Sequence, residues 1–186
     1  MFHANTRRLI EDWSARRGDR LVPSRADISP DEFRDFLPQL FILGREGAEA
    51  FRLAGGLLVD LHDRDLRGVS FLSLWPYPDR TMVAEAMDQA RTTGVPAVLE
   101  ASAWTAEGCE VGLEIVLAPL VGPSGQVDRV LGLYQPTSGL RRLLGQPIKE
   151  LTLREITLSA RSAAPLAPRP QRPALRLAAV DGHRIG

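Results

Sequence analysis

Cysteine is nearly absent from the sequence, and this scarcity excludes two ways of stabilising a small fold. Cys109 is the only thiol, so it cannot form an internal disulfide or supply the several thiolates of a structural zinc site. A chain of 186 residues can instead bury most of its apolar surface in one hydrophobic core. We therefore expect a cytoplasmic protein with one main domain and appended segments.

An excess of charge of either sign is also absent. The chain has 23 basic and 23 acidic residues, so its formal net charge is zero, and no net field draws it to nucleic-acid phosphates or an anionic membrane. No apolar run approaches the roughly 18 residues that cross a bilayer, and residues 1–13 do not resemble a signal peptide. The sequence predicts no nucleic-acid binding and no direct insertion into a membrane.

Recognised catalytic motifs are missing as well. The sequence has no glycine-rich phosphate loop followed by Lys-Ser/Thr, no nucleophile elbow and no zinc-protease helix. Ser124 lies in the segment GPSGQ, whose composition is that of a turn. Glu100 and Glu114 fall on predicted neighbouring strands, but acid–base work also needs a pocket, and exposed or arginine-paired glutamates are the simpler interpretation. We predict no catalytic residues and no enzyme activity.

His62 lies among Asp60, Asp63 and Asp65, and imidazole and carboxylate groups are common ligands of divalent ions. The spacing of these acids does not match an EF-hand loop, and no second histidine stands at a helical ligand spacing. The alternative interpretation is a solvated helical turn. We predict no metal site.

The sequence does contain an ordered series of short elements. An amphipathic helix from Asn5 to about Arg17 places Leu9, Ile10 and Trp13 on one face. The elements expected after it are a short helix at 29–38, strands at 40–45 and 50–59, a helical turn at 60–68, a longer helix at 79–92, and strands at 97–104, 111–120 and 127–134. Residues 148–158 fit an extended or a helical addition.

The predicted strand at 111–120 is apolar on both faces. Val111 and Leu113 share one face, while Val116 and Leu120 lie on the other. Such a strand belongs to a sheet that needs a cover on each side. One cover would be the central helices, and the other either the N-terminal helix or a second subunit.

Three regions follow from this order. We expect residues 1–38 to form an N-terminal helical cap and connection, 39–136 the core, and 137–186 a C-terminal extension. Within that extension, residues 162–173 have the proline and alanine content of a linker. Residues 174–186 are apolar enough to add a strand, to this sheet or to that of a partner.

The order of two strands, short helices, one longer helix and three strands resembles the PAS arrangement. That arrangement is an α+β fold with a five-stranded antiparallel sheet, short helices and one longer helix on one face, here preceded by the N-terminal amphipathic helix. Over roughly 8–136 the chain resembles the alphaproteobacterial PAS-like domains of the PAS_5 family. The matching residues are Trp13, Arg17-Gly18, Pro23-Ser24-Arg25, Asp27, Phe51-Arg52-Leu53-Ala54-Gly55, Leu66-Arg67-Gly68, Phe71, Leu74-Trp75, Asp79-Arg80, Leu113-Glu114, Pro119-Leu120 and Leu131-Gly132. The chain departs from the family at Gly56, which replaces a small polar residue, and near Asp63, where a turn glycine is absent.

The resemblance implies a regulatory domain that binds small molecules, dimerises or relays signals. PAS domains that bind haem generally supply an axial histidine from the long helix, and residues 79–92 contain none. Photoactive flavin PAS domains carry a cysteine in the short helices, whereas Cys109 lies near a strand turn. We therefore expect no cofactor, although a ligand held without covalent or axial bonds fits both observations.

Two sets of residues are candidates for function. A cavity between helices and sheet would hold a non-covalent ligand, and the alternative is a filled core. A homodimer would form through the N-terminal helix and the outer face of the sheet. The cavity candidates are Arg52, Phe71, Trp75, Met87, Leu99, Trp104, Leu117 and Leu133, and the dimer-helix candidates are Leu9, Ile10 and Trp13.

Our first hypothesis is a non-enzymatic, cytoplasmic bacterial PAS-like signalling module that acts through protein association. It would be a homodimer whose output passes to a separate signalling protein, because no kinase, cyclase or DNA-binding segment is recognisable in the sequence. The second hypothesis is a small-molecule sensor whose ligand shifts that association. The third, from another class, is an uncatalogued enzyme.

Overall fold

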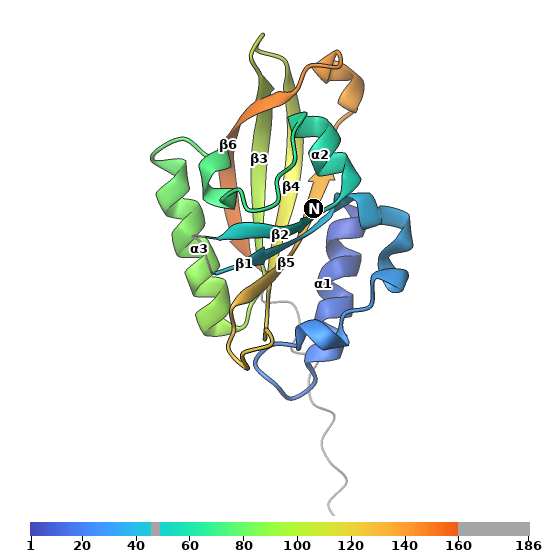
Figure 1. The fold of residues 1–186 in the computed structure, drawn as a ribbon, viewed down its shortest axis with the longest axis vertical. Helices are drawn as coiled ribbons and strands as arrows, with labels where there is room; N and C mark the ends of the chain where they lie inside the picture. The colour runs from blue at the N-terminus through green and yellow to red at the C-terminus, as the bar shows by residue number, and fades with distance from the viewer. Residues whose placement is uncertain (46–48, 160–186) are drawn as a thin grey trace, which may run out of the picture.

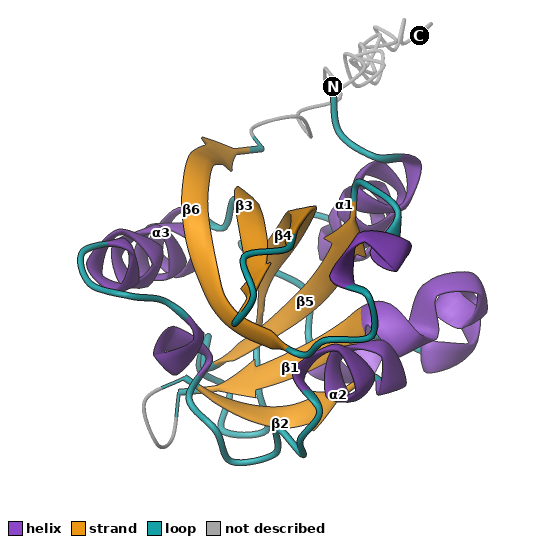
Figure 2. Cartoon of the chain, turned by 90° about the horizontal axis from the view of Figure 1, so that it is seen from above, coloured by secondary structure: helices purple, strands orange, loops and turns teal. Residues whose placement is uncertain are grey.

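The computed structural model describes residues 1–45 and 49–159 of the chain (Figure 1). Its centre is one antiparallel sheet in the order β2-β1-β5-β4-β3-β6, strongly curved and flanked by helices on both faces (Figure 2). The strands are β1 (Leu40–Gly44), β2 (Ala50–Ala54), β3 (Ala97–Thr105), β4 (Glu110–Leu120), β5 (Arg129–Pro136) and β6 (Ile148–Leu158).

Three α-helices and several 3₁₀ turns connect and cover these strands. The α-helices are α1 (Ala4–Arg17), α2 (Gly56–His62) and α3 (Asp79–Thr93). The 3₁₀ segments are η1 (Arg25–Asp27), η2 (Pro30–Gln39), η3 (Phe71–Leu74) and η4 (Leu140–Leu143). The longest α-helix in the described ranges, α3, has 15 residues, and no helix within those ranges could cross a bilayer.

The expected α+β PAS-like fold is confirmed, with one strand more than the five expected. Of the two alternatives for 148–158 the extended one is right, because β6 pairs antiparallel with β3 along its length. The strand expected at 50–59 is shorter than predicted. Gly55 ends it, and the apolar residues that follow belong to α2, where Leu58 and Leu61 face the core.

The sheet has the two covers that its apolar faces require. Helices α2 and α3 with η3 pack on one face, and α1 with η2 packs on the other. Trp13 is buried under α1, where its indole Nε1–H donates a 2.9 Å hydrogen bond to the backbone carbonyl of Pro119 on β4. The chain's own N-terminal helix therefore supplies the second cover.

Two backbone positions explain features of the sequence. Asp63 ends α2 in the left-handed region, with φ of 48°, and aspartate tolerates this conformation better than most residues, which accounts for the missing glycine. Gly132 on β5 is required for another reason. A Cβ there would lie 2.0 Å from the ring of Phe41, so the ring of Phe41 rests directly on the backbone of β5.

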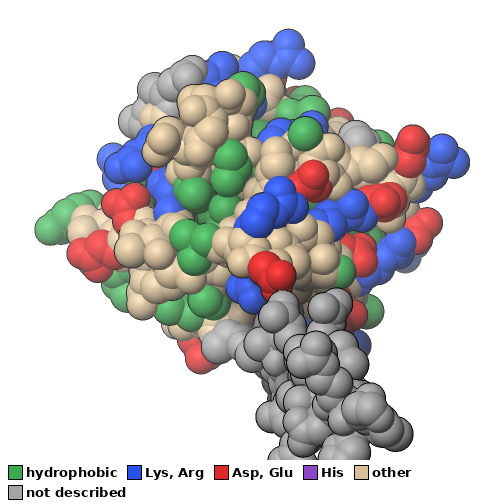
Figure 3. Space-filling model, turned by 90° about the horizontal axis from the view of Figure 1, so that it is seen from below, with side chains coloured by type: hydrophobic (Ala, Val, Ile, Leu, Met, Phe, Trp, Pro, Cys, Tyr) green, Lys and Arg blue, Asp and Glu red, His purple; other side chains and the backbone are tan. Residues whose placement is uncertain are grey.

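The three predicted regions stay a prediction, and residues 162–173 and 174–186 lie outside the described residues. On the face seen from below, acidic and basic side chains are interspersed (Figure 3). This mixture agrees with the formal net charge of zero.

Candidate functional site

The space between the helices and the sheet, where the sequence places a ligand cavity, is packed with side chains. Phe71, Trp75, Met87, Leu99 and Leu117 are all buried in one hydrophobic cluster there. The structure therefore brings five of the eight cavity candidates together. Their packing favours the filled-core interpretation of this region.

An aromatic chain accounts for much of this filling. The ring centroids of Phe41 and Phe51 are 5.5 Å apart, those of Phe41 and Phe71 5.6 Å, and those of Phe71 and Trp75 5.9 Å. These separations are typical of favourable edge-to-face and offset ring pairs. Phe41 and Phe51 were not among the cavity candidates, although alternation along the two strands that carry them could have placed both on this face.

The other three cavity candidates lie elsewhere. Leu133 packs on the opposite face of the sheet, in the cluster under α1. Arg52 is exposed on β2, with its side chain next to Gly44 of β1, and Trp104 is half-buried near the end of β3. None of the three borders the space that Phe71 and Trp75 fill.

Polar groups are nevertheless buried in this interior. His62 Nε2 lies 3.2 Å from the hydroxyl oxygen of Tyr134, and the backbone of Ile148 also hydrogen-bonds the imidazole ring. Burial, with a smaller contribution from Arg64, lowers the pKa of His62 to about 4, and burial raises the pKa of Tyr134. Both side chains are therefore neutral near pH 7.

The interpretation of His62 as part of a solvated turn is wrong, because only 6% of the residue is exposed. Leu58, Leu61 and His62 lie on one face of α2 at positions i, i+3 and i+4. The pattern becomes visible in the sequence when the helix is predicted to begin at Gly56 rather than at Asp60. Within the described ranges no group of three or more His, Cys, Asp or Glu side chains is arranged to hold a metal ion.

The indole Nε1–H of Trp75 has no hydrogen-bond partner among residues 1–45 and 49–159, although Trp75 is buried. Burying an amide-like donor without an acceptor is unfavourable. Trp75 is therefore the one cavity candidate with an unused polar group in the interior as described.

Glu100 and Glu114 are directly opposed on β3 and β4, as neighbouring strands predict. Glu114 is buried rather than exposed or paired with arginine. Its two carboxylate oxygens accept hydrogen bonds of 3.0 and 2.9 Å from the backbone N–H of His3, at the start of α1. The Glu114 side chain thus caps the N-terminus of α1, where the positive end of the helix dipole lies.

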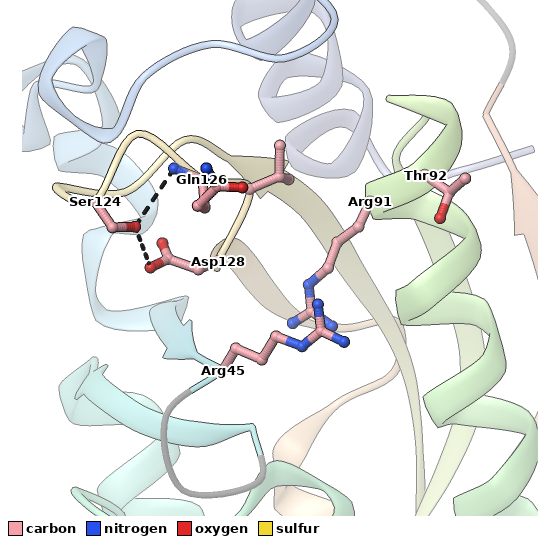
Figure 4. Close-up of a pocket in the computed structure, with 7 residues that line it drawn as sticks. Arg45, Arg91, Thr92, Ser124, Gln126 and Asp128 are labelled. Carbon is pink, nitrogen blue, oxygen red and sulfur yellow. Dashed lines mark hydrogen bonds between the residues drawn. The ribbon is translucent and has the colours of Figure 1, made fainter.

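A polar hollow of about 590 Å³ lies where the β4–β5 turn meets α3 (Figure 4). The guanidinium groups of Arg45 and Arg91 point toward one another in it, and the Ser124 hydroxyl donates a 2.9 Å hydrogen bond to Asp128. Arg91 is already neutralised by a bidentate ion pair with Glu49. The Ser124 hydroxyl also accepts a hydrogen bond from the backbone N–H of Gln126, so this side chain bridges residues of the β4–β5 turn.

A curved antiparallel sheet crossed on one face by short helices and one longer helix defines the class of PAS-like signalling domains. Within this class the chain belongs to the PAS_5 family, because the family model, described as a PAS domain, matches residues 1–135. No curated protein matches the sequence. Strand β6 lies beyond the matched residues.

Solved structures with a similar fold include light-oxygen-voltage (LOV) domains. The dark structure of the blue-light photoreceptor Aureochrome1 LOV has 13% identity, covers 61% of this chain and 86% of that chain, and gives a TM-score of 0.45. The LOV protein of Rhodobacter sphaeroides has 12% identity, covers 62% of this chain and 72% of that chain, and gives a TM-score of 0.44. An RNA-binding LOV receptor has 13% identity, covers 62% of this chain and 35% of that chain, and also gives a TM-score of 0.44. At these identities the likeness concerns the fold alone.

Proposed function

We propose that this chain is a non-enzymatic, cytoplasmic PAS-like regulatory module that acts by associating with other protein chains, as a homodimer and with a separate signalling partner. The observation that carries the proposal is the filled interior. Phe41, Phe51, Phe71 and Trp75 occupy the space between helices and sheet. A domain with a packed interior transmits a signal by changing which surfaces it presents.

Admitting a ligand to this interior would require ring displacement. The ring of Phe41 rests on Gly132 and contacts Phe51 and Phe71. Forcing extra atoms into a well-packed core typically costs about 1–3 kcal/mol, which a ligand would have to offset before it gained any affinity. This energetic barrier supports association over ligand sensing.

The dimer-helix candidates constrain how a homodimer could form. Leu9, Ile10 and Trp13 are buried against the chain's own sheet, so they can join two copies only if the copies exchange α1. Exchange of an identical element preserves every contact that the helix makes and is a known route to dimers. The proposed homodimer therefore uses either exchanged helices or surfaces other than this apolar stripe.

Native mass spectrometry of the purified full chain tests the proposal. We expect the mass of two chains, with no additional bound mass that is lost in Trp75→Phe. A protein that is monomeric at every concentration would contradict the homodimer. Deleting residues 1–17 should abolish a dimer built by helix exchange, and an unchanged oligomeric mass after this deletion would eliminate that geometry.

A second candidate function, small-molecule sensing in the interior, is favoured by one specific observation. The buried Nε1–H of Trp75 has no acceptor among residues 1–45 and 49–159, and a ligand oxygen could supply one. The same mass spectrum distinguishes the two functions, because a copurified small molecule that is lost in Trp75→Phe would support sensing. The matched control Trp104→Phe changes a half-buried indole outside this interior.

A further inference from the structure

The outer face of the sheet is covered unevenly. On this face Leu131 of β5, Ile42 of β1 and Leu53 of β2 lie side by side in register. Helix α1 and η2 cover the row at Leu131 and Ile42, which are 2% and 9% exposed, whereas Leu53 is 45% exposed. The apolar row thus continues past its cover to the β2 edge of the sheet.

A groove of about 510 Å³ occupies this uncovered strip. Its floor includes Ile42, Leu53 and Leu131, and one wall is formed by Phe33 and Leu37 of η2. Leu37 is itself 40% exposed. The groove is therefore an apolar surface open to solvent and built from segments distant in sequence.

The lining of the groove includes a tight backbone contact between Gly55 and Pro38. A Cβ at Gly55 would lie 2.2 Å from the carbonyl oxygen of Pro38, so the end of η2 touches the start of α2. Gly56, next along the chain, also lines the groove, but a Cβ at Gly56 would meet no atom within 4 Å. This part of the lining is thus fixed by the backbone, and space remains open beside it at Gly56.

The charged side chains that line the groove are both basic. They are Arg25, which donates a 3.2 Å hydrogen bond to the Ile28 carbonyl, and Arg67, which is exposed. A guanidinium group binds carboxylates with two parallel hydrogen bonds. An apolar floor with two arginines, and with no Asp or Glu among the described residues that line it, is complementary to an occupant with an apolar body and an anionic end.

We propose that this groove binds a small amphiphile of the fatty-acid class, with its alkyl chain on Leu53 and Ile42 and its carboxylate on an arginine. The volume lies within the roughly 300–1,000 Å³ range of small-molecule sites. A second copy of the same surface would bring arginines against arginines across a two-fold interface. A partner helix needs anchor pockets along several turns, whereas this groove of about 510 Å³ has the volume of a small-molecule site.

The test uses decanoate below its micelle concentration, with decanol as the uncharged match, and follows amide NMR shifts of the full chain. We expect saturable shifts in β2 and η2 with decanoate, and binding about tenfold weaker with decanol, because an ionic hydrogen bond is lost. Arg67→Ala should weaken decanoate binding by a similar factor. The matched control Arg64→Ala changes a nearby exposed arginine that does not line the groove and should leave binding unchanged.

Two further variants test the apolar floor. Leu53→Glu places a carboxylate where the alkyl chain would lie and should abolish binding, while Gly56→Leu fills the open space and should weaken it severalfold. Unchanged melting temperatures verify that each variant is folded. If Leu53→Glu unfolds, Gly56→Leu alone tests the groove. The proposal is overturned if no saturable shifts occur, if decanol binds as tightly as decanoate, or if the folded groove variants bind decanoate as the parent chain does.

Discussion

His62 and Tyr134 join α2 to the sheet through a polar contact inside the hydrophobic core. The ring nitrogen Nε2 of His62 lies 3.2 Å from the Tyr134 hydroxyl oxygen, and the two rings meet edge to face at 5.9 Å. Because both groups are buried, this contact pairs polar atoms that are shielded from water, and the backbone of Ile148 bonds the imidazole ring as well. The pair holds the short helix that follows β2 against strand β5.

This pair predicts a dependence of stability on pH. Burial lowers the pKa of His62 from its ordinary value of 6.5 to about 4, so the unfolded chain binds more protons than the folded chain between these values. Stability is therefore complete above about pH 6.5 and falls as the pH is lowered toward 4, by an amount on the order of 3 kcal/mol. Urea denaturation across this pH window measures the effect.

Two variants test whether His62 causes that dependence of stability on pH. His62→Leu removes the titrating group and should flatten the stability profile between pH 6.5 and 4. Tyr134→Phe leaves the imidazole buried and should keep most of the slope, because burial is the larger cause of the lowered pKa. An equally steep profile in His62→Leu would show that another group is responsible.

The close approach of Phe41 to Gly132 predicts that substitutions at these two positions have non-additive effects on the free energy of unfolding. Gly132→Ala introduces a Cβ 2.0 Å from the Phe41 ring and should destabilise the fold by about 1–3 kcal/mol, as overpacked cores do. Phe41→Leu frees space at the same point. The double variant should lose less free energy of unfolding than the sum of the two single variants, and strict additivity would contradict the contact.

Arg91 and Glu49 form a buried ion pair between α3 and the start of β2, with side chains 6% and 12% exposed. Glu49→Ala should cost about 3 kcal/mol, because the arginine is left buried with only the more exposed Asp88 as a partner. The matched control is Asp35→Ala. Asp35 pairs with Arg8 on the surface, where the two side chains are 79% and 46% exposed, respectively, so losing this pair should cost less than about 1 kcal/mol. Thermal unfolding of both variants compares them, and equal losses would contradict the difference in burial.

Ile10→Asp tests the role of helix α1 as a cover of the sheet. The substitution places a carboxylate between α1 and the sheet, and burying an unpaired charge should lower the free energy of unfolding by more than about 3 kcal/mol. The exposed neighbour Glu11 provides the control, because Glu11→Ala should change stability by less than about 0.5 kcal/mol. If Ile10→Asp dissociates a dimer but melts at the same temperature as the parent chain, the apolar stripe of α1 joins two chains and does not cover its own sheet.

The order and type of most elements could be predicted because their signals are local. The stripe of Leu9, Ile10 and Trp13 is visible within α1 alone, and Gly94 ends α3 in the left-handed region as the sequence suggests. Strand β6 was ambiguous for a physical reason. Its pairing with β3 shifts register between Glu100 and Ala101, which interrupts the two-residue alternation that identifies a strand.

The candidate sites were harder to predict because they depend on distant contacts. Arg25, Leu53 and Arg67 all belong to segments that resemble the PAS_5 family, but only the folded chain places them along one groove. Leu133 is apolar like Leu117, yet the two lie on opposite faces of the sheet. A strand that is apolar on both faces gives no signal to tell which side is which.

The hydrogen bond between Trp13 and Pro119 spans 106 residues of sequence, and this separation has a consequence for synthesis of the protein. Ribosomes add about 5–20 residues per second, so roughly 5–20 s elapse between translation of α1 and translation of the strand that covers it. During that interval the apolar stripe of α1 lacks β4 and β5, which supply much of the cluster in which it is buried, and is open to chaperones or to other nascent chains. The yield of folded protein in cells should therefore depend on how this first helix is protected while the rest of the chain is made.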